Sequence, residues 1–286
     1  FQRSSGAIGS SLKGLASTFA GAFTAKQLQG VLDDFTRLQN SLRVAGLEGE
    51  ALAGVQSKLL GLSTRYGVSI NELANLYGQS AQAASDLGAS EEQLLQLTEA
   101  SAQALKITGT SAAQAQGALL GLTQALASGT VRAEEFNQIN EGGLRPLLQV
   151  AANTERFGGS VAKLRQAVVD GKVSSQEFYT AILAGSEELD AKASKATLTL
   201  AGAFEALSSR LTVYMGEASA ANGVTAALSG AIGLLADNIE VIIPALAVLV
   251  SALGIGFVTN AIAARVAAQS LGASLLTAFG GPVGLA

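Results

Sequence analysis

Apolar residues recur every three or four positions through most of this 286-residue chain, and this spacing constrains the fold more than any other feature. Such spacing places side chains on one face of an α-helix, whereas a strand alternates every second residue. No stretch of the sequence alternates in that way with β-branched enrichment, so no strand is predicted. We therefore predict an all-α fold. The clearest apolar seams are Leu28-Val31-Phe35-Leu38-Leu42-Ala45, Ala115-Leu119-Leu122-Leu126 and Leu189-Ala193-Ala196-Leu200-Ala203-Leu207-Leu211.

Short polar and glycine signals mark the helix boundaries. Ser69 with Glu72, Ser90 with Gln93 and Ser174 with Glu177 have the spacing of a capping box, in which the hydroxyl accepts from the third helical amide. Glycine tolerates the left-handed conformation that often follows a helix. Glycines at the ends of periodic stretches are Gly67, Gly88, Gly109, Gly129, Gly158 and Gly171. We expect short helices between these positions.

One element occurs twice. Gly129–Phe136 and Gly171–Phe178 share the pattern G-x-V-x-x-x-E-F at an offset of 42 residues. The pattern combines a turn glycine, an apolar residue before the helix, a capping glutamate and a phenylalanine that would point inward. Two copies are too few for a solenoid, so we predict a duplicated helix-turn element within one helical module.

These signals predict four regions. Residues 1–45 form a long amphipathic, coiled-coil-like helix, and 46–185 form the module of short helices. Residues 186–221 form a second long heptad-patterned helix, and 222–286 form apolar, Ala/Gly-rich helices. We expect the two long helices to self-associate through a seam of apolar residues: Leu28, Val31, Phe35, Leu38, Leu42, Leu189, Leu200 and Leu207.

Composition excludes several kinds of chemistry. The chain has no His and no Cys, so it has no imidazole base, thiolate nucleophile, disulfide or His- or Cys-ligated metal. The net charge is −4 without a basic block, which argues against a nucleic-acid-binding footprint. Aromatic residues are only 5% of the chain and 53 residues are Ala, which favours closely packed or extended helices over an enzyme core. No catalytic residue, cofactor or metal is predicted.

Three adjacent acid pairs are the remaining candidates for catalysis: Glu91-Glu92, Glu134-Glu135 and Glu187-Glu188. A pair of carboxylates could serve glycoside hydrolysis. We favour a different explanation, because each pair falls in a predicted first helical turn, where the helix dipole stabilises negative charge. Substituting Glu134 and Glu135 with Gln would test the enzyme hypothesis.

The last 46 residues differ from the rest. Arg265 is their only charge, and residues 241–264 are 24 uncharged residues in a row. As a helix this stretch would span about 36 Å, enough for a hydrocarbon core of about 30 Å. We predict membrane insertion, with a buried helix pair in an oligomer core as the alternative that residues 266–286 favour. The predicted inserting residues are Val241, Ile242, Ile243, Leu246, Val248, Leu249, Val250, Leu253, Ile255 and Phe257.

An ordered set of segments resembles the tape measure domain of tailed-bacteriophage tail proteins. Tyr66-Gly67-Val68-Ser69-Ile70-Asn71-Glu72-Leu73 and Glu141-Gly142-Gly143-Leu144-Arg145-Pro146-Leu147-Leu148 belong to the set, together with both G-x-V turns. The further matching segments are 38–43, 100–109 and 127–139. The similarity covers roughly residues 30–210. Members of that family are much longer, so we expect this chain to be a piece of a longer protein.

The resemblance implies a structural, non-enzymatic protein that lies inside the tail tube of the virion in a few copies, three or six, and sets tail length during assembly. The implied partners are tail tube and tail tip proteins and a tail assembly chaperone. At infection such a protein leaves ahead of the DNA, which it does not bind sequence-specifically, and helps it cross the host inner membrane. The alternative hypothesis is a pore-forming helical protein unrelated to tails.

Overall fold

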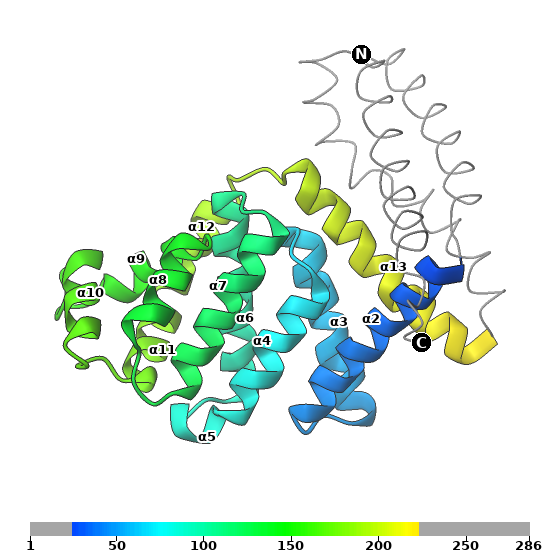
Figure 1. Cartoon of the computed structure of the whole chain (residues 1–286), viewed down its shortest axis with the longest axis horizontal. Coiled ribbons are helices and arrows are strands. Elements are labelled where there is room, and N and C mark those ends of the chain that lie inside the picture. The colour runs from blue at the N-terminus through cyan, green and yellow to red at the C-terminus, as the bar shows by residue number, and fades with distance from the viewer. Residues whose placement is uncertain (1–24, 223–286) are drawn as a thin grey trace, which may run out of the picture. The chain divides into compact units, whose positions relative to one another are not determined.

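The computed structural model describes residues 25–222, and it confirms the all-α fold in this part of the chain. Residues 29–222 belong to one compact unit, shown in Figure 1. The described residues form twelve helices and no strand. The helices are α2 (Ala25–Val44), α3 (Gly49–Tyr66), α4 (Ile70–Gln82), α5 (Ala84–Leu87), α6 (Glu91–Thr108), α7 (Ala112–Ala127), α8 (Ala133–Glu141), α9 (Arg145–Ala152), α10 (Val161–Val169), α11 (Ser175–Ala184), α12 (Ser186–Ala193) and α13 (Leu200–Asn222).

Helix ends follow the glycine signals closely. Gly67, Gly88 and Gly109 each end a helix in the left-handed conformation, as the sequence predicts. The capping box of Ser90 and Gln93 is present in both directions. The one expected at Ser69 is wrong, because that hydroxyl makes no capping hydrogen bond.

Helix α6 lies at the centre and packs against α3, α4, α9, α11 and α12. It can have so many neighbours because small residues cover it on every side: Ala100, Ser101, Ala102 and Ala104 are all buried. The buried hydroxyl of Ser101 donates to the carbonyl of Leu97 at 2.8 Å, so it leaves no polar atom unsatisfied. The alanine content therefore serves close helix packing in a compact unit.

The predicted long helix over 186–221 is instead two helices. The chain leaves helical geometry after α12 and resumes at α13, where the Thr199 hydroxyl accepts from the amide of Gly202 at 3.0 Å and caps the new helix. The break allows α12 to pack on α6 and α13 to pack on α3. The seam from Leu189 to Leu211 is therefore not one continuous face.

The helices are arranged from one end of the unit to the other. Helices α8 to α12 gather at one end, α4, α6 and α7 lie in the middle, and α2, α3 and α13 form the opposite edge (Figure 1). A single cluster of buried apolar side chains runs through all three parts, from Leu38 and Leu42 of α2 to Val213 of α13.

Candidate functional site

The two copies of the repeated turn meet in space. The amide of Val131 donates to the carbonyl of Val173 at 3.0 Å, and the amide of Ser175 donates to the carbonyl of Gly129 at 3.0 Å. Thr130 and Ser174 thereby form an antiparallel bridge. The pairing gives hydrogen-bond partners to backbone groups of the buried residues Val131, Val173 and Ser175.

Both copies also place the same residue types in the core. Val131 and Val173 are at most 1% exposed, and so are Phe136 and Phe178. Because the valines sit beside the bridge and the phenylalanines one turn into α8 and α11, each copy anchors its helix to the same interior. The repeat is therefore a paired anchor for the folded unit.

The two glutamates of the repeat have different partners. Glu135 accepts from the backbone amide of Arg132 at 2.9 Å. Glu177 forms an ion pair with Arg156, whose guanidinium also donates to the carbonyl of Lys172 at 2.8 Å. Arg156 therefore ties the loop before α10 to the second turn.

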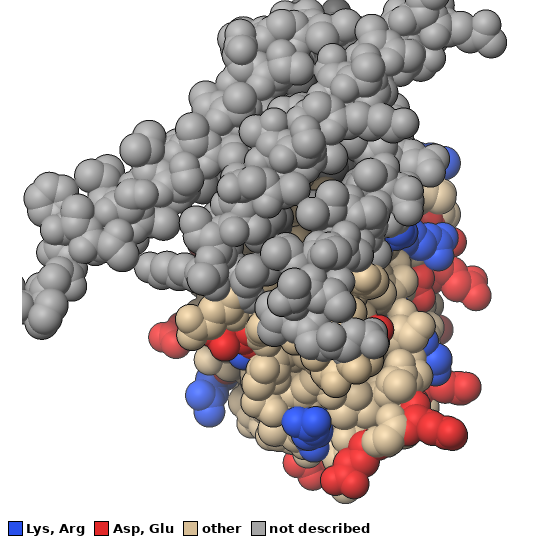
Figure 2. All heavy atoms as spheres, turned by 90° about the vertical axis from the view of Figure 1, so that its right-hand side faces the viewer, with Lys and Arg blue, Asp and Glu red and all other residues tan. Residues whose placement is uncertain are grey.

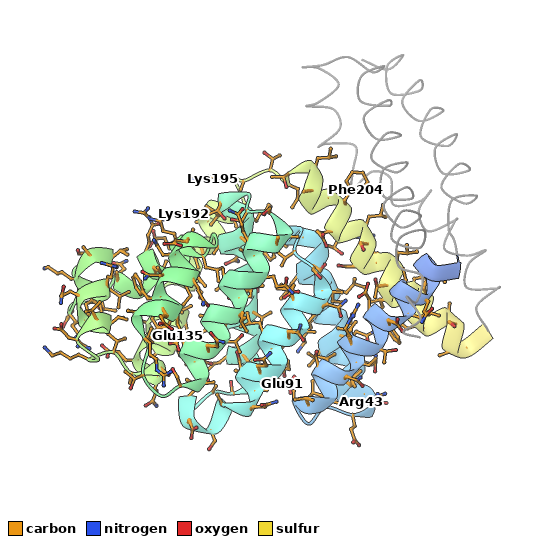
Figure 3. The ribbon with its side chains drawn as sticks, in the orientation of Figure 1. Arg43, Glu91, Glu135, Lys192, Lys195 and Phe204 are labelled. Carbon is orange, nitrogen blue, oxygen red and sulfur yellow. The ribbon has the colours of Figure 1, made fainter. Side chains whose placement is uncertain are left out.

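The three acid pairs each lie in the first turn of a helix, as the dipole argument predicts. They begin α6, α8 and α12, so the pairs lie on separate helices, and Figure 3 shows Glu91 and Glu135 apart from one another. The described residues contain no group of three or more His, Cys, Asp or Glu side chains that could hold a metal ion.

A polar groove of about 900 Å³ lies between α2, α4 and α13. We call it the edge groove. Its lining is dominated by amides, hydroxyls and carboxylates, including Asp34, Glu72 and Glu205. Arg37 also lines it and pairs with Asp34. A groove of this kind is unlike a small-molecule pocket, which is mostly apolar.

The carboxylates of the edge groove repel one another. Burial raises the pKa of Glu72 above its ordinary value of 4.5, and the charge of Glu205 raises it further. Burial likewise raises the pKa of Glu205, with a contribution from Asp34. The ionised forms of Glu72 and Glu205 are therefore disfavoured, mainly by burial and to a smaller extent by the neighbouring carboxylates.

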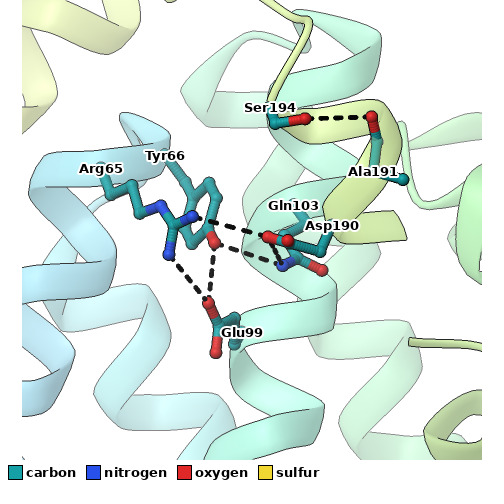
Figure 4. A network of polar contacts seen from close by, with 7 residues as sticks. All are labelled: Arg65, Tyr66, Glu99, Gln103, Asp190, Ala191 and Ser194. Atoms are coloured by element: carbon teal, nitrogen blue, oxygen red, sulfur yellow. Dashed lines mark hydrogen bonds and ion pairs between the residues drawn. The ribbon is translucent and has the colours of Figure 1, made fainter. Parts of the chain in front are cut away.

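A polar network joins α3, α6 and α12 (Figure 4). The Tyr66 hydroxyl donates to Glu99 at 2.7 Å and accepts from the Gln103 amide at 3.2 Å. Arg65 lies 3.7 Å from Glu99 and 3.5 Å from Asp190, and its guanidinium lies over the Tyr66 ring. Burial, with the hydrogen bond to Glu99, raises the pKa of Tyr66 to about 12. The network fixes α12 on the central helix.

The predicted self-association seam is divided by the fold. Leu38, Leu42 and Leu189 have no exposed surface, because the chain's own helices cover them. Val31, Phe35, Leu200 and Leu207 are partly exposed, and the side chain of Leu28 lies outside the described residues. Self-association through the remaining positions stays a prediction.

The predicted membrane-inserting residues, from Val241 to Phe257, lie outside the described residues. Among residues 25–222, no helix is both long and apolar enough to cross a bilayer. On the described surface that Figure 2 shows, acidic and basic side chains are interspersed, in agreement with the absence of a basic block from the sequence.

The edge groove and the Tyr66 network were not predicted from the sequence. A signal for the groove is present in the sequence, since Glu205 is a single acid within the otherwise uncharged stretch from Ala196 to Ser209. An acid among residues that pack inward faces either a partner or a polar cavity. No comparable local signal marks the network, because its members come from three separated helices.

Comparison with known proteins gives one match. Residues 26–220 match the sequence model of the family described as "Tape measure protein". The match begins within α2 and ends within α13, so it covers the folded unit nearly from end to end. No curated protein and no solved structure matches the chain.

Proposed function

The chain belongs to the tape measure protein family, and from this premise we propose that it is a structural component of a phage tail that sets tail length during assembly. The observation that carries the proposal is the match over residues 26–220, which includes the paired turns, all of α3 to α12 and most of α2 and α13. A continuous helix advances about 1.5 Å per residue, so chain length converts directly into distance along a tube.

The proposed partners are those of a protein inside a tube: tail tube subunits, tail tip proteins, a tail assembly chaperone and further copies of itself, three or six in number. Copies would meet through the seam positions that keep exposed surface, which are Val31, Phe35, Leu200 and Leu207. The proposed role is non-enzymatic, and DNA would pass without sequence-specific contacts.

The tail proposal is tested by locating the chain in purified particles. A short peptide tag between Gly158 and Gly159 sits at a turn where nothing lies within 4 Å of an added side-chain atom. We expect immunoelectron microscopy of partly disassembled tails to find the tag in the tube lumen, and mass spectrometry to find a few copies per tail. Absence of the chain from purified tails would refute the proposal.

We propose further that the protein leaves the tail at infection and that residues 241–264 enter the host inner membrane. The support is the run of 24 uncharged residues rich in Ile, Leu and Val. A pore-forming protein unrelated to tails would share this property, and only the tail experiment separates the two.

Liposome flotation and dye release test the membrane step. An aspartate at the centre of a membrane helix opposes insertion by about 3 kcal/mol, so Val248→Asp should abolish binding and leakage. Leu275→Asp, in the second apolar stretch, is the matched control and should retain both. Binding that survives both substitutions and truncation of residues 241–286 would contradict the proposed membrane role.

A further inference from the structure

The helices by which the chain enters and leaves the folded unit touch each other. In Figure 1, α2 and α13 lie at the same edge. The ring of Phe35 lies directly against the backbone of Gly216, so closely that a side-chain carbon added to Gly216 would stand 2.0 Å from the ring. Only glycine allows this contact, which makes it a specific feature of the fold.

A second contact joins the same two helices through a third. The Gln39 amide donates to the Gln56 carbonyl oxygen, and the Gln56 amide in turn donates to Glu217 at 2.8 Å. Gln56 is buried, at 5% exposure, whereas Gln39 is half-buried and Glu217 is exposed, so the two hydrogen bonds are shielded from water only at the Gln56 end. Hydrogen bonds therefore link polar side chains of α2, α3 and α13 beside the contact of Phe35 with Gly216.

The chain thus returns at residue 216 to the place where residue 35 lies. We call residues 35–216 the closed unit. Drawn out as one continuous helix, these roughly 180 residues would span about 270 Å. In the folded unit their two ends lie in van der Waals contact, so the distance they contribute along any axis is close to zero.

Extending the closed unit would expose its whole interior. The buried cluster is continuous from α2 to α13, and the paired turns join residues 129–131 to residues 173–175. Each fully buried Val, Leu, Ile or Phe side chain favours the folded state by about 1.5–3 kcal/mol before entropy is counted. A drawn-out rod inside a narrow tube offers no equivalent burial for these side chains.

We propose that residues 35–216 stay folded in the assembled tail and are not counted in its length, so that only chain outside this closed unit acts as the ruler. The proposal rests on the proposed function in tail-length control. The proposal divides the protein into two parts. One is the closed unit, whose ends are joined by the contact of Phe35 with Gly216, and the other is the chain outside it, which sets the tail length.

Insertions at different sites show which parts of the chain contribute to tail length. The test uses phage particles whose tape measure chain carries these residues, with a helical spacer of about 60 residues placed between Gly158 and Gly159. If the spacer is counted, tails lengthen by about 90 Å; we expect no change. The matched control carries the same spacer in the chain outside residues 25–222, and its tails should lengthen by that amount.

The two insertions separate the failure of this inference from that of the proposed function. If both spacers lengthen the tails, the inference that the closed unit does not contribute to tail length is overturned, while the ruler function is left intact. No lengthening by either spacer would overturn the ruler function, and with it the inference. Lengthening by the outside spacer alone supports both.

Crosslinking reports directly on closure. The chain contains no cysteine, so Gln39→Cys with Glu217→Cys introduces the only two thiols, both at positions that contact Gln56. A short bismaleimide should join them within one chain in intact particles as efficiently as in the purified protein. Efficient crosslinking in the purified protein but none in particles would overturn the proposal, and each single-cysteine variant controls for links between copies.

Discussion

Around the paired turns, backbone groups pair with each other and four apolar side chains are removed from water, whereas at the edge formed by α2, α4 and α13 the helices meet through a glycine and a polar groove. The first region loses hydrophobic burial if it opens. Opening the second also exposes buried side chains such as Leu38, Leu42 and Val213, but it relieves the burial and mutual repulsion of carboxylates. The comparison shows that one continuous core can have parts of unequal stability, and we expect the edge to open first.

The largest expected effect comes from truncating a phenylalanine in each region. Phe178→Ala should lower the free energy of unfolding by about 3–5 kcal/mol, because it leaves a cavity in a packed interior. Phe35→Ala should cost less, because Phe35 is partly exposed and its loss frees only the edge. Chemical denaturation of both variants measures the difference, and equal losses would break the comparison.

A smaller effect is expected from filling the close approach at the edge. Gly216→Ala should destabilise by about 1–3 kcal/mol, since the added methyl group collides with the Phe35 ring. Hydrogen exchange should show the loss in α2 and α13 and not in α7. Gly117→Ala is the matched control, because it lies in a helix with nothing within 4 Å and should be neutral or stabilising. Uniform loss of protection in every helix would show that the edge does not open separately.

Two buried tyrosines sharpen the comparison further. Tyr66→Phe should cost about 1–2 kcal/mol, because Glu99 and Gln103 lose their shared partner. Tyr179→Phe should be neutral or stabilising, because its buried hydroxyl has no hydrogen-bond partner among the described residues. The midpoint of thermal unfolding should therefore fall in Tyr66→Phe and should stay the same or rise in Tyr179→Phe. A large loss in Tyr179→Phe would reveal a partner for that hydroxyl.

The smallest effect concerns pH. The raised pKa values of Glu72 and Glu205 mean that the folded chain binds protons more readily than the unfolded chain. Their contribution to stability is therefore most favourable at low pH and is lost as pH rises above 4.5 through the raised values. Glu205→Gln should increase stability at pH 7, and its advantage over the natural protein should shrink on acidification.

The control for pH lies on the same helix. Glu217→Gln removes the same charge, but from an acceptor of the Gln56 amide, so it should not stabilise the protein. Comparing variants is necessary because other carboxyls act in the opposite direction: hydrogen bonds from Gln166 and Lys172 lower the pKa of Asp170. A Glu205→Gln variant whose advantage is independent of pH would contradict the electrostatic explanation of the edge groove.

Local signals in the sequence predicted local structure well. The three-and-four spacing gave the helices, and Gly67, Gly88 and Gly109 marked their ends, because both signals depend on a few neighbouring residues. The duplicated turn was visible too, but its pairing was not, since nothing in either copy encodes contact with the other. The break before α13 was missed because the heptad spacing continues through it.

The predicted self-association seam also shows the limit of local sequence signals. Apolar spacing cannot say whether a face meets a second chain or a distant part of its own, and Leu38, Leu42 and Leu189 meet their own chain. Likewise Ser69 and Glu72 have capping-box spacing, yet Glu72 lines the edge groove instead. Tertiary contacts decide between alternatives that are equivalent locally.

The bridge between Thr130 and Ser174 has a consequence for the order of folding. It closes a loop that contains α8, α9 and α10, so it can form only when those helices have already brought the two turns together. Closing such a loop costs conformational entropy that the contacts across it recover only once they have formed. The amide protons of Val131 and Ser175, which make the two bridging hydrogen bonds, should therefore become protected together and late in refolding, as a single kinetic signature of the duplicated element.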